Sequence, residues 1–189
     1  MCELSFVGFA EPQAAMLDSY KAALMQGWSP NDVRDVSQQE LIEIKADPIG
    51  YLNLLRDDAP IAGRTNLLAD GRAVARLPMR LRWIWDGDFC GQIGLRWQPG
   101  TNALPPHVLG HIGYSVVPWK RGHGLGKRAL RHMLGDARDV GLTQLELTTD
   151  PDNIASQSVI MANGGRLLGR FVYPIGSAVE KCRYVIDLA

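Results

Sequence analysis

Hydrophobic and polar residues follow two different periodicities along the chain, and each predicts one kind of element. Between residues 125 and 140 the apolar positions recur at the spacing of one helix face, with basic residues off that face. Gly141 supplies the expected end of this helix. Around the Asp-Gly-Asp turn at 86–88, alternating apolar and polar residues in 81–85 and 89–97 predict a β-hairpin.

Other extended runs predict a second group of strands. These runs lie at 111–117, 145–149, 166–173 and 179–188. The last two flank Pro174-Ile175-Gly176-Ser177 and predict a closing hairpin. Asp150-Pro151 has the chemistry of a helix cap with proline in the first turn, which predicts a helix that ends before Gly164.

The first third of the chain has a weaker pattern. Apolar residues from 14 to 25 predict a helix that ends near 27–30, where glycine and proline interrupt the pattern. Ser37-Gln38-Gln39-Glu40 has the spacing of a capping box and predicts the start of a second helix. Residues 51–55 add another helical turn or two, and we interpret 57–78 as a loop with one short strand. Because helices alternate with the central strands, the sequence predicts one α/β domain.

Composition narrows the class of protein. The chain has 189 residues, of which 46% are hydrophobic and 21% charged, as in an ordinary globular domain. A domain of this length buries enough surface to fold without a metal or a disulfide. With 20 basic and 20 acidic residues the formal net charge is zero. This balance argues against a protein that coats nucleic acid or an anionic membrane, so any anion site must be local.

The cysteines and the N-terminus bear on location. Cys2, Cys90 and Cys182 are far apart, which opposes a zinc site or a disulfide framework and favours reduced thiols. Residues 1–10 lack the basic region of a signal peptide, and no apolar run reaches the length of a membrane span. We therefore expect a cytoplasmic location.

The most informative stretch is residues 121–128, which read Arg-Gly-His-Gly-Leu-Gly-Lys-Arg. It lies between a predicted strand and a predicted helix, where backbone N–H groups and the helix dipole favour a phosphate. Arg121, Lys127 and Arg128 put cations at the helix end where the dipole disfavours them, and a bound polyanion would reverse that effect. Taken alone, the stretch is also compatible with a solvated glycine-rich turn.

Three phosphate-binding motifs compete for this stretch. The dinucleotide motif G-x-G-x-x-G fails because Lys127 stands where its third glycine belongs. The Walker motif fails because Arg121 replaces its first glycine and Arg128 replaces its hydroxyl residue. The pattern R/Q-x-x-G-x-G/A fits, with Arg121, Gly124 and Gly126 in register.

With this motif the chain resembles the GNAT superfamily of N-acetyltransferases over roughly residues 80–170. Residues 113–118 are similar to the fourth strand of that family, and 152–165 to its Asn-x-x-Ser…Asn-Gly helix beside the thioester. The resemblance implies a mixed α/β fold. Its central, mostly antiparallel, twisted sheet of about six to seven strands is flanked by helices and splayed at the cofactor-binding strand.

The resemblance also implies the organisation of the chain. We expect a single N-acetyltransferase domain over 1–189, with variable acceptor-side helices in 1–78, an acetyl-CoA-binding core in 79–170 and a closing hairpin in 171–189. Acetyl-CoA is the implied co-substrate, and no metal is expected. The implied cofactor-binding residues are Val116, Val117, Arg121, Gly122, His123, Gly124, Leu125, Gly126, Lys127, Asn153 and Ser156.

The chemistry of acetyl transfer suggests catalytic candidates. An alkylamine has a pKa of roughly 10, so it must lose its proton before it attacks, and the oxyanion needs a donor, most simply a backbone N–H in 114–117. Many family members protonate the thiolate with a tyrosine at the position that Ile160 occupies here, and Ser156 is the nearest polar substitute. For the base, His111, Tyr114 and a chain of water molecules are alternatives, and His111 is equally an ordinary strand histidine.

The sequence does not name the acceptor. Arg80, Arg82 and Arg96 fit either a cationic wall for an acidic substrate or a solvated strand face. Trp28 and Tyr51 fit either an acceptor pocket or the core.

These observations lead to one main functional hypothesis. We expect an acetyl-CoA-dependent N-acetyltransferase that acts on a primary amine of a small molecule, an amino acid or a protein N-terminus. Attack is expected to be direct, in a ternary complex, because the motif region has no cysteine. The main alternative is a catalytically inactive acyl-CoA-binding sensor or regulator of the same fold, and a different phosphate-binding enzyme is the third. We expect no nucleic acid or membrane partner, and leave a homodimer open.

Overall fold

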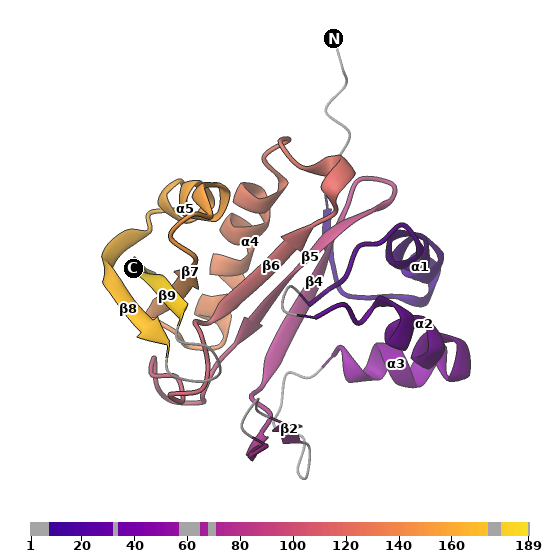
Figure 1. Cartoon of the computed structure of the whole chain (residues 1–189), viewed down its shortest axis with the longest axis horizontal. Coiled ribbons are helices and arrows are strands. Elements are labelled where there is room, and N and C mark those ends of the chain that lie inside the picture. Colours follow the sequence, from indigo (N-terminus) through magenta and orange to yellow (C-terminus); the bar gives the residue numbers. More distant parts are fainter. Residues whose placement is uncertain (1–7, 32–33, 57–64, 68–70, 174–178, 189) are drawn as a thin grey trace.

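Two sheets lie side by side in the centre of the molecule, and helices cover them (Figure 1). The computed structural model describes residues 8–31, 34–56, 65–67, 71–173 and 179–188. The first sheet has the order β1-β4-β5-β6, with strands Gly8–Ala10, Met79–Trp85, Phe89–Arg96 and Ile112–Val116. The second has the order β7-β9-β8, with strands Gln144–Thr149, Val179–Asp187 and Arg166–Tyr173. All pairings within the two sheets are antiparallel.

Strands β4 and β5 form the predicted hairpin. The turn between them contains Gly87 at φ +111°, a conformation that favours glycine. Side chains alternate between the two faces, so that Trp83 packs toward the N-terminal helices and Ile84 packs into the core under the long helix. Trp83 and Trp97 of this hairpin are buried and serve the packing of the sheet.

The long amphipathic helix, α4, spans Leu125–Asp139 and confirms the predicted element. Its apolar face is fully buried on the sheets, and Gly141 at φ +84° follows its end. Asp136 lies on the same buried face and accepts two hydrogen bonds of 3.0 Å from the guanidinium of Arg82. Arg80 is 3.5 Å from the same carboxylate. Arg82 and Arg80 therefore hold β4 to α4, and neither the cationic-wall nor the solvated-face interpretation is right for them.

The N-terminal helices cover the other face of the first sheet (Figure 1). A short 3-10 helix, Ala14–Met16, leads into α1, Leu17–Met25, and is followed by α2, Ser37–Ala46, and α3, Pro48–Leu54. Helix α2 begins at Ser37 as predicted, but Ser37 and Glu40 do not form the capping box. The Glu40 carboxylate accepts hydrogen bonds from the hydroxyls of Tyr20 and Tyr51 instead, and the Ser37 N–H donates to Asp35.

Two other element boundaries differ from the prediction. Residues 65–67 and 73–75 form two short paired strands, β2 and β3, where one strand was predicted. Three-residue strands carry too little alternation to be recognised.

Helix α5, Ile154–Met161, begins after Asn153, whose side chain accepts from the Ser156 N–H at 3.0 Å. Asp150 does not cap it, because that carboxylate pairs with Lys181 at 2.6 Å.

Strands β8 and β9 form the predicted closing hairpin. The expected turn at 174–177 lies outside the described residues, as do Cys2 and the first seven residues. Cys90 and Cys182 are buried free thiols. None of the helices in the described part of the chain is long and apolar enough to cross a bilayer.

Candidate active site

A glycine-rich loop joins the first sheet to α4. After β6, a 3-10 turn at Pro118–Lys120 redirects the chain, and residues 121–124 then lead into the helix. Gly122 has φ +84° and Gly124 has φ +73°, so both occupy the left-handed region that favours glycine. A Cβ built on either residue would meet no heavy atom within 4 Å. The two glycines therefore border open space in front of the α4 N-terminus.

The backbone N–H groups of residues 122–127, in this loop and the start of α4, donate no hydrogen bond within the described part of the protein. Unsatisfied amides at a helix N-terminus, together with the helix dipole, favour an anion. Leu125 and Gly126 are buried beneath the loop, whereas residues 121–124 are exposed. The arrangement can therefore bind phosphate oxygens through the main chain.

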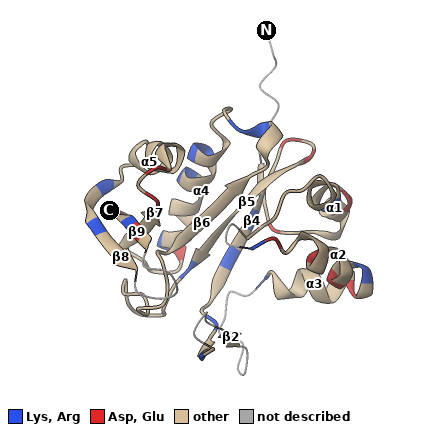
Figure 2. Ribbon diagram, in the orientation of Figure 1, with Lys and Arg blue, Asp and Glu red and all other residues tan. Residues whose placement is uncertain are grey.

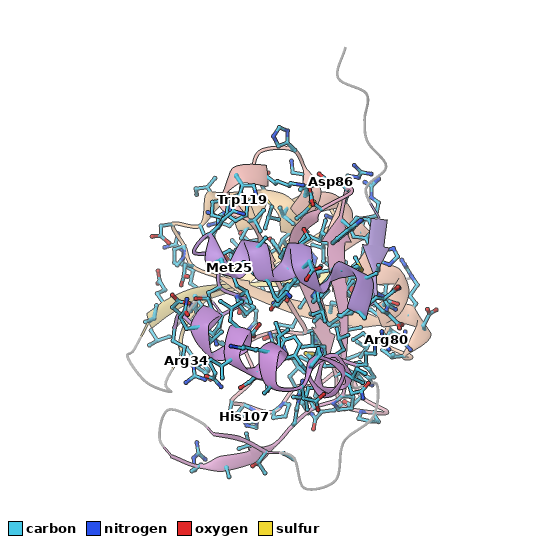
Figure 3. All side chains as sticks on the ribbon, turned by 90° about the vertical axis from the view of Figure 1, so that its right-hand side faces the viewer. Met25, Arg34, Arg80, Asp86, His107 and Trp119 are labelled. Atoms are coloured by element: carbon cyan, nitrogen blue, oxygen red, sulfur yellow. The ribbon has the colours of Figure 1, made fainter. Side chains whose placement is uncertain are left out.

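The charges around the loop match such an anion. Figure 2 shows basic residues on the loop and on the start of α4, and the first turn of α4 has no acidic residue. Arg121 is exposed, and its Nε donates to the Val116 carbonyl at 3.0 Å, which ties the loop to β6. Lys120 does not add to this cationic surface, because its Nζ lies 2.5 Å from Asp86. Figure 3 shows Asp86 and Trp119 at this end of the molecule and His107 at the opposite end.

One edge of β6 faces the second sheet without pairing to it. On its other edge β6 pairs with β5, where the Val117 N–H donates to the Cys90 carbonyl at 3.0 Å. Because backbone groups alternate in direction along an antiparallel strand, Tyr114 and Val116 point their N–H and C=O groups away from β5. These groups face the gap between β6 and β7, where an extended ligand or a developing oxyanion can be bound.

Two predicted catalytic residues meet beside this gap. The Tyr114 hydroxyl of β6 lies 2.9 Å from the Ser156 Oγ of α5. Burial raises the pKa of Tyr114, and the hydrogen bond to Ser156 opposes that rise. Tyr114 is therefore protonated near neutral pH and can donate a proton, but it is a poor base. Ile160, at the position of the family's tyrosine, is buried in the core.

His111 lies apart from this pair. It precedes β6, is only 1% exposed, and lies outside the core cluster against which Tyr114 packs. Its Nδ1 accepts a hydrogen bond from the Glu146 N–H of β7 at 2.9 Å. The structure therefore does not bring His111 together with Ser156. His123 lies on the exposed loop, as expected for a cofactor contact.

Trp28 makes a contact that the sequence did not indicate. Its indole N–H, in the segment after α1, donates to the Ser115 Oγ of β6 at 2.9 Å. Trp28 and Tyr51 are both buried in the core of the N-terminal helices. The core interpretation therefore holds for both, and Trp28 additionally anchors the N-terminal helices to the strand that borders the gap. The sequence does not indicate this contact, because 87 residues separate Trp28 from Ser115.

Comparison with known proteins agrees with this geometry. The sequence matches the acetyltransferase (GNAT) family over residues 14–164. Among curated protein sequences, none is significantly similar to the chain.

Several solved structures have the same fold over nearly the whole chain. The microcin C7 self-immunity acetyltransferase MccE, in complex with acetyl-CoA and AMP, is 13% identical with a TM-score of 0.61, over 96% of this chain and 92% of that one. RimL, a ribosomal L7/L12 alpha-N-protein acetyltransferase in complex with coenzyme A, is 12% identical with a TM-score of 0.62, over 96% and 93%. Mycobacterium smegmatis RimJ, in complex with CoA-disulfide, is 20% identical with a TM-score of 0.65, over 96% and 81%.

Proposed function

The chain belongs to the acetyltransferase (GNAT) family, and from this premise we propose that it transfers the acetyl group of acetyl-CoA to a primary amine by direct attack in a ternary complex. The observation that carries the proposal is the row of unused amides at residues 122–127, next to the free edge of β6. The proposed acceptor is an amine of a small molecule, an amino acid or a protein N-terminus. The names of RimL and RimJ are the reason to include protein N-termini.

The residues of the loop fit the diphosphate of coenzyme A. The open space beside Gly122 and Gly124 leaves room for an anion, and the unused amides supply its hydrogen-bond donors. Arg121, His123 and Lys127 add exposed side chains around the loop. The backbone N–H of Val116, whose carbonyl already accepts from Arg121, suits a carbonyl of the pantetheine arm, and buried Val117 and capping residue Asn153 hold the flanking elements in place. When bound, acetyl-CoA supplies the activated acetyl group.

Ser156 and Tyr114 are placed to handle the proton of the leaving group. In the proposed role, the Ser156 hydroxyl donates its proton to the thiolate and receives one from the Tyr114 hydroxyl, 2.9 Å away. The raised pKa of Tyr114 keeps that proton available at neutral pH. A water molecule then restores the tyrosine. The backbone N–H of Tyr114 is the proposed donor to the oxyanion.

Direct attack is favoured over a thioester on the enzyme. Burial raises the pKa of the Cys90 thiol to about 11, so that it stays protonated and is a poor nucleophile. Cys182 is buried as well. Neither of the described cysteines is therefore a reactive thiol that could take the acetyl group before the amine does. We propose that a water molecule carries away the proton of the attacking amine.

The cofactor site can be tested with one glycine substitution. Gly124→Ala adds a Cβ to the open space in front of the amides, and we expect the Kd for acetyl-CoA to rise about tenfold in calorimetry. Gly141→Ala is the matched control, because Gly141 also has a positive φ and open space but lies at the far end of α4. The control should lose similar stability and keep the wild-type Kd. An unchanged Kd for Gly124→Ala would contradict the proposal.

Catalysis needs a separate measurement. Release of free thiol from acetyl-CoA, measured with small amines, amino acids and short peptides, should identify at least one acceptor. Tight binding of acetyl-CoA without thiol release for any of these amines would favour the alternative function, a sensor or regulator. Buried Ile160 at the family's tyrosine position is the observation behind that alternative.

A further inference from the structure

The two sheets are joined at one point by a pair of hydrogen bonds. The His111 N–H donates to the Glu146 carbonyl at 2.7 Å, and the Glu146 N–H donates to the His111 Nδ1 at 2.9 Å. Beyond this pair, no hydrogen bond between described residues joins β6 to β7. The sheets therefore separate directly after His111, and the gap that borders the candidate active site opens from there.

The residue before His111 fits the same close approach. Gly110 has φ +77°, and a Cβ built on it would lie 3.0 Å from the Glu146 carbonyl oxygen and 3.2 Å from the Leu147 Cα. A larger residue would be strained at this φ and would require the backbone of β7 to shift by a few tenths of an ångström. Gly110 and His111 thus form the vertex, the point where the two sheets meet. Gly110 allows the close approach because it has no side chain, and His111 holds it through the hydrogen bond to its imidazole.

The hydrogen bond to Nδ1 determines the protonation state of the ring. A backbone N–H always carries its hydrogen, so Nδ1 must offer a lone pair and the neutral ring carries its proton on Nε2. Nδ1 also lies 3.3 Å from the Glu146 carbonyl, but it cannot donate to that oxygen while it accepts the closer Glu146 N–H. The only basic nitrogen of the neutral imidazole is therefore occupied, which argues against a role in removing the proton of the amine.

The surroundings of the ring favour the neutral form. Burial lowers the pKa of His111, the Glu146 carbonyl 3.3 Å from Nδ1 opposes this, the charge of Arg96 on β5 lowers the pKa further, and the Asn102 backbone raises it. His111 lines a cavity of about 410 Å³ together with two charged residues, Glu146 of β7 and Arg183 of β9. The Arg183 Nε lies 3.3 Å from the Glu146 Oε1, so these two charges pair with each other. A neutral ring is the form that can accept the Glu146 N–H.

We propose that His111 is a positioning residue, whose Nδ1 fixes the point where β6 separates from β7 and thereby sets the free edge of β6 against Ser156 of α5. The inference rests on the proposed function, because that edge is where we place the thioester arm. Without the Nδ1 acceptor, the half-buried Glu146 N–H loses its partner, and the strands can part earlier along β6. The Tyr114–Ser156 pair, which spans the gap, would then lose its geometry.

Two substitutions separate positioning from base catalysis. In His111→Asn the side-chain oxygen can take the place of Nδ1, whereas His111→Leu has no acceptor. We expect His111→Asn to keep kcat within about threefold of wild type with an unchanged pH profile above pH 7. We expect His111→Leu to raise the KM for acetyl-CoA about tenfold and to lower kcat. Equal, large losses of kcat in both variants, with an unchanged KM for acetyl-CoA, would overturn the proposal.

A measurement on the wild-type protein keeps the proposal testable if His111→Leu fails to fold. Long-range proton–nitrogen correlation NMR of the imidazole should show the hydrogen on Nε2 and a hydrogen-bonded lone pair on Nδ1. A hydrogen on Nδ1 at neutral pH would refute the positioning role. This readout needs no cofactor and no acceptor, so its failure is distinct from a failure of the proposed acetyltransfer, which thiol release tests.

Discussion

Two hydroxyl groups from distant parts of the chain, those of Tyr114 and Ser156, meet at the edge of the gap between the sheets. Because groups that act as one unit give non-additive losses, a double-mutant cycle tests their proposed partnership. We expect Ser156→Ala to lower kcat about 100-fold and Tyr114→Phe to lower it less, without a change in the Kd for acetyl-CoA. The double variant should be no slower than Ser156→Ala. Independent, additive losses in the rate of thiol release would rule out the relay.

At this scale the sequence indicates which residues belong to the site better than it indicates which residues they contact. Ser156 and Tyr114 were recognised from their positions in motifs, but 42 residues separate them and no local pattern predicts their contact. Glu40 was misread for a related reason. A glutamate three residues after a serine fits a capping box, but two buried tyrosine hydroxyls bind its carboxylate in the folded chain. Tertiary partners overrode the local motif.

At the scale of elements, Glu40 joins the three N-terminal helices. It lies on α2 and accepts from Tyr20 of α1 and Tyr51 of α3. Burial raises the pKa of Glu40, while the two tyrosine hydrogen bonds oppose that rise. A raised pKa in the folded state means that protonation favours folding. The contribution of Glu40 to stability is therefore fully present below its unfolded pKa and is lost as pH rises through its folded pKa.

Urea unfolding of wild type and Glu40→Gln between pH 4 and pH 7 tests this sign. Glutamine keeps an acceptor for the tyrosines but cannot titrate. We expect the free energy of unfolding of wild type, relative to Glu40→Gln, to be greatest at pH 4 and to decrease toward pH 7. Glu43→Gln, an exposed position on the same helix, is the control and should show little of this trend. A difference that grows with pH would show that the carboxylate is stabilised in its charged form.

Helix α4 is attached to the first sheet by charge as well as by its apolar face. The Asp136 carboxylate is nearly buried and holds Arg82 through two hydrogen bonds, with Arg80 close by. Asp136→Ala leaves Arg82 without its main partner, and we expect a loss of about 3 kcal/mol in the free energy of unfolding. Asp139→Ala, on the exposed side of the helix, should cost less than about 0.5 kcal/mol. Similar losses in the two variants would contradict a structural role for the Arg82–Asp136 pair.

How well an element was predicted depended on its length and on competing contacts. Helix α4 has four turns of regular spacing, and the hairpin of β4 and β5 has two long alternating runs around an Asp-Gly turn. Both were predicted correctly. Strands β2 and β3 are three residues each and carry almost no pattern. The start of α5 was misplaced because Asp150 binds Lys181, which left the cap to Asn153.

At the scale of the whole molecule, the separation of the two sheets organises the candidate site. The sheets meet at His111, and β6 runs from there toward the loop in front of α4 (Figure 1). The loop amides, the free edge of β6 and the Tyr114–Ser156 pair thus border one continuous region. The motif predicted the loop and the splayed strand, but not the vertex, because the contact of His111 with Glu146 depends on how the sheets are joined. The acceptor has no comparable motif, because the apolar pattern of the N-terminal helices reflects only the packing of their own core.

The central claim is that the amides of residues 122–127 bind the diphosphate of coenzyme A. The most direct measurement is a titration of nitrogen-15-labelled protein with coenzyme A, followed through the backbone amide resonances. The account predicts the largest shifts, with new hydrogen bonding, at residues 122–127 and smaller ones at Tyr114 and Val116. Binding that leaves the amides of 122–127 unshifted while resonances elsewhere move would contradict it.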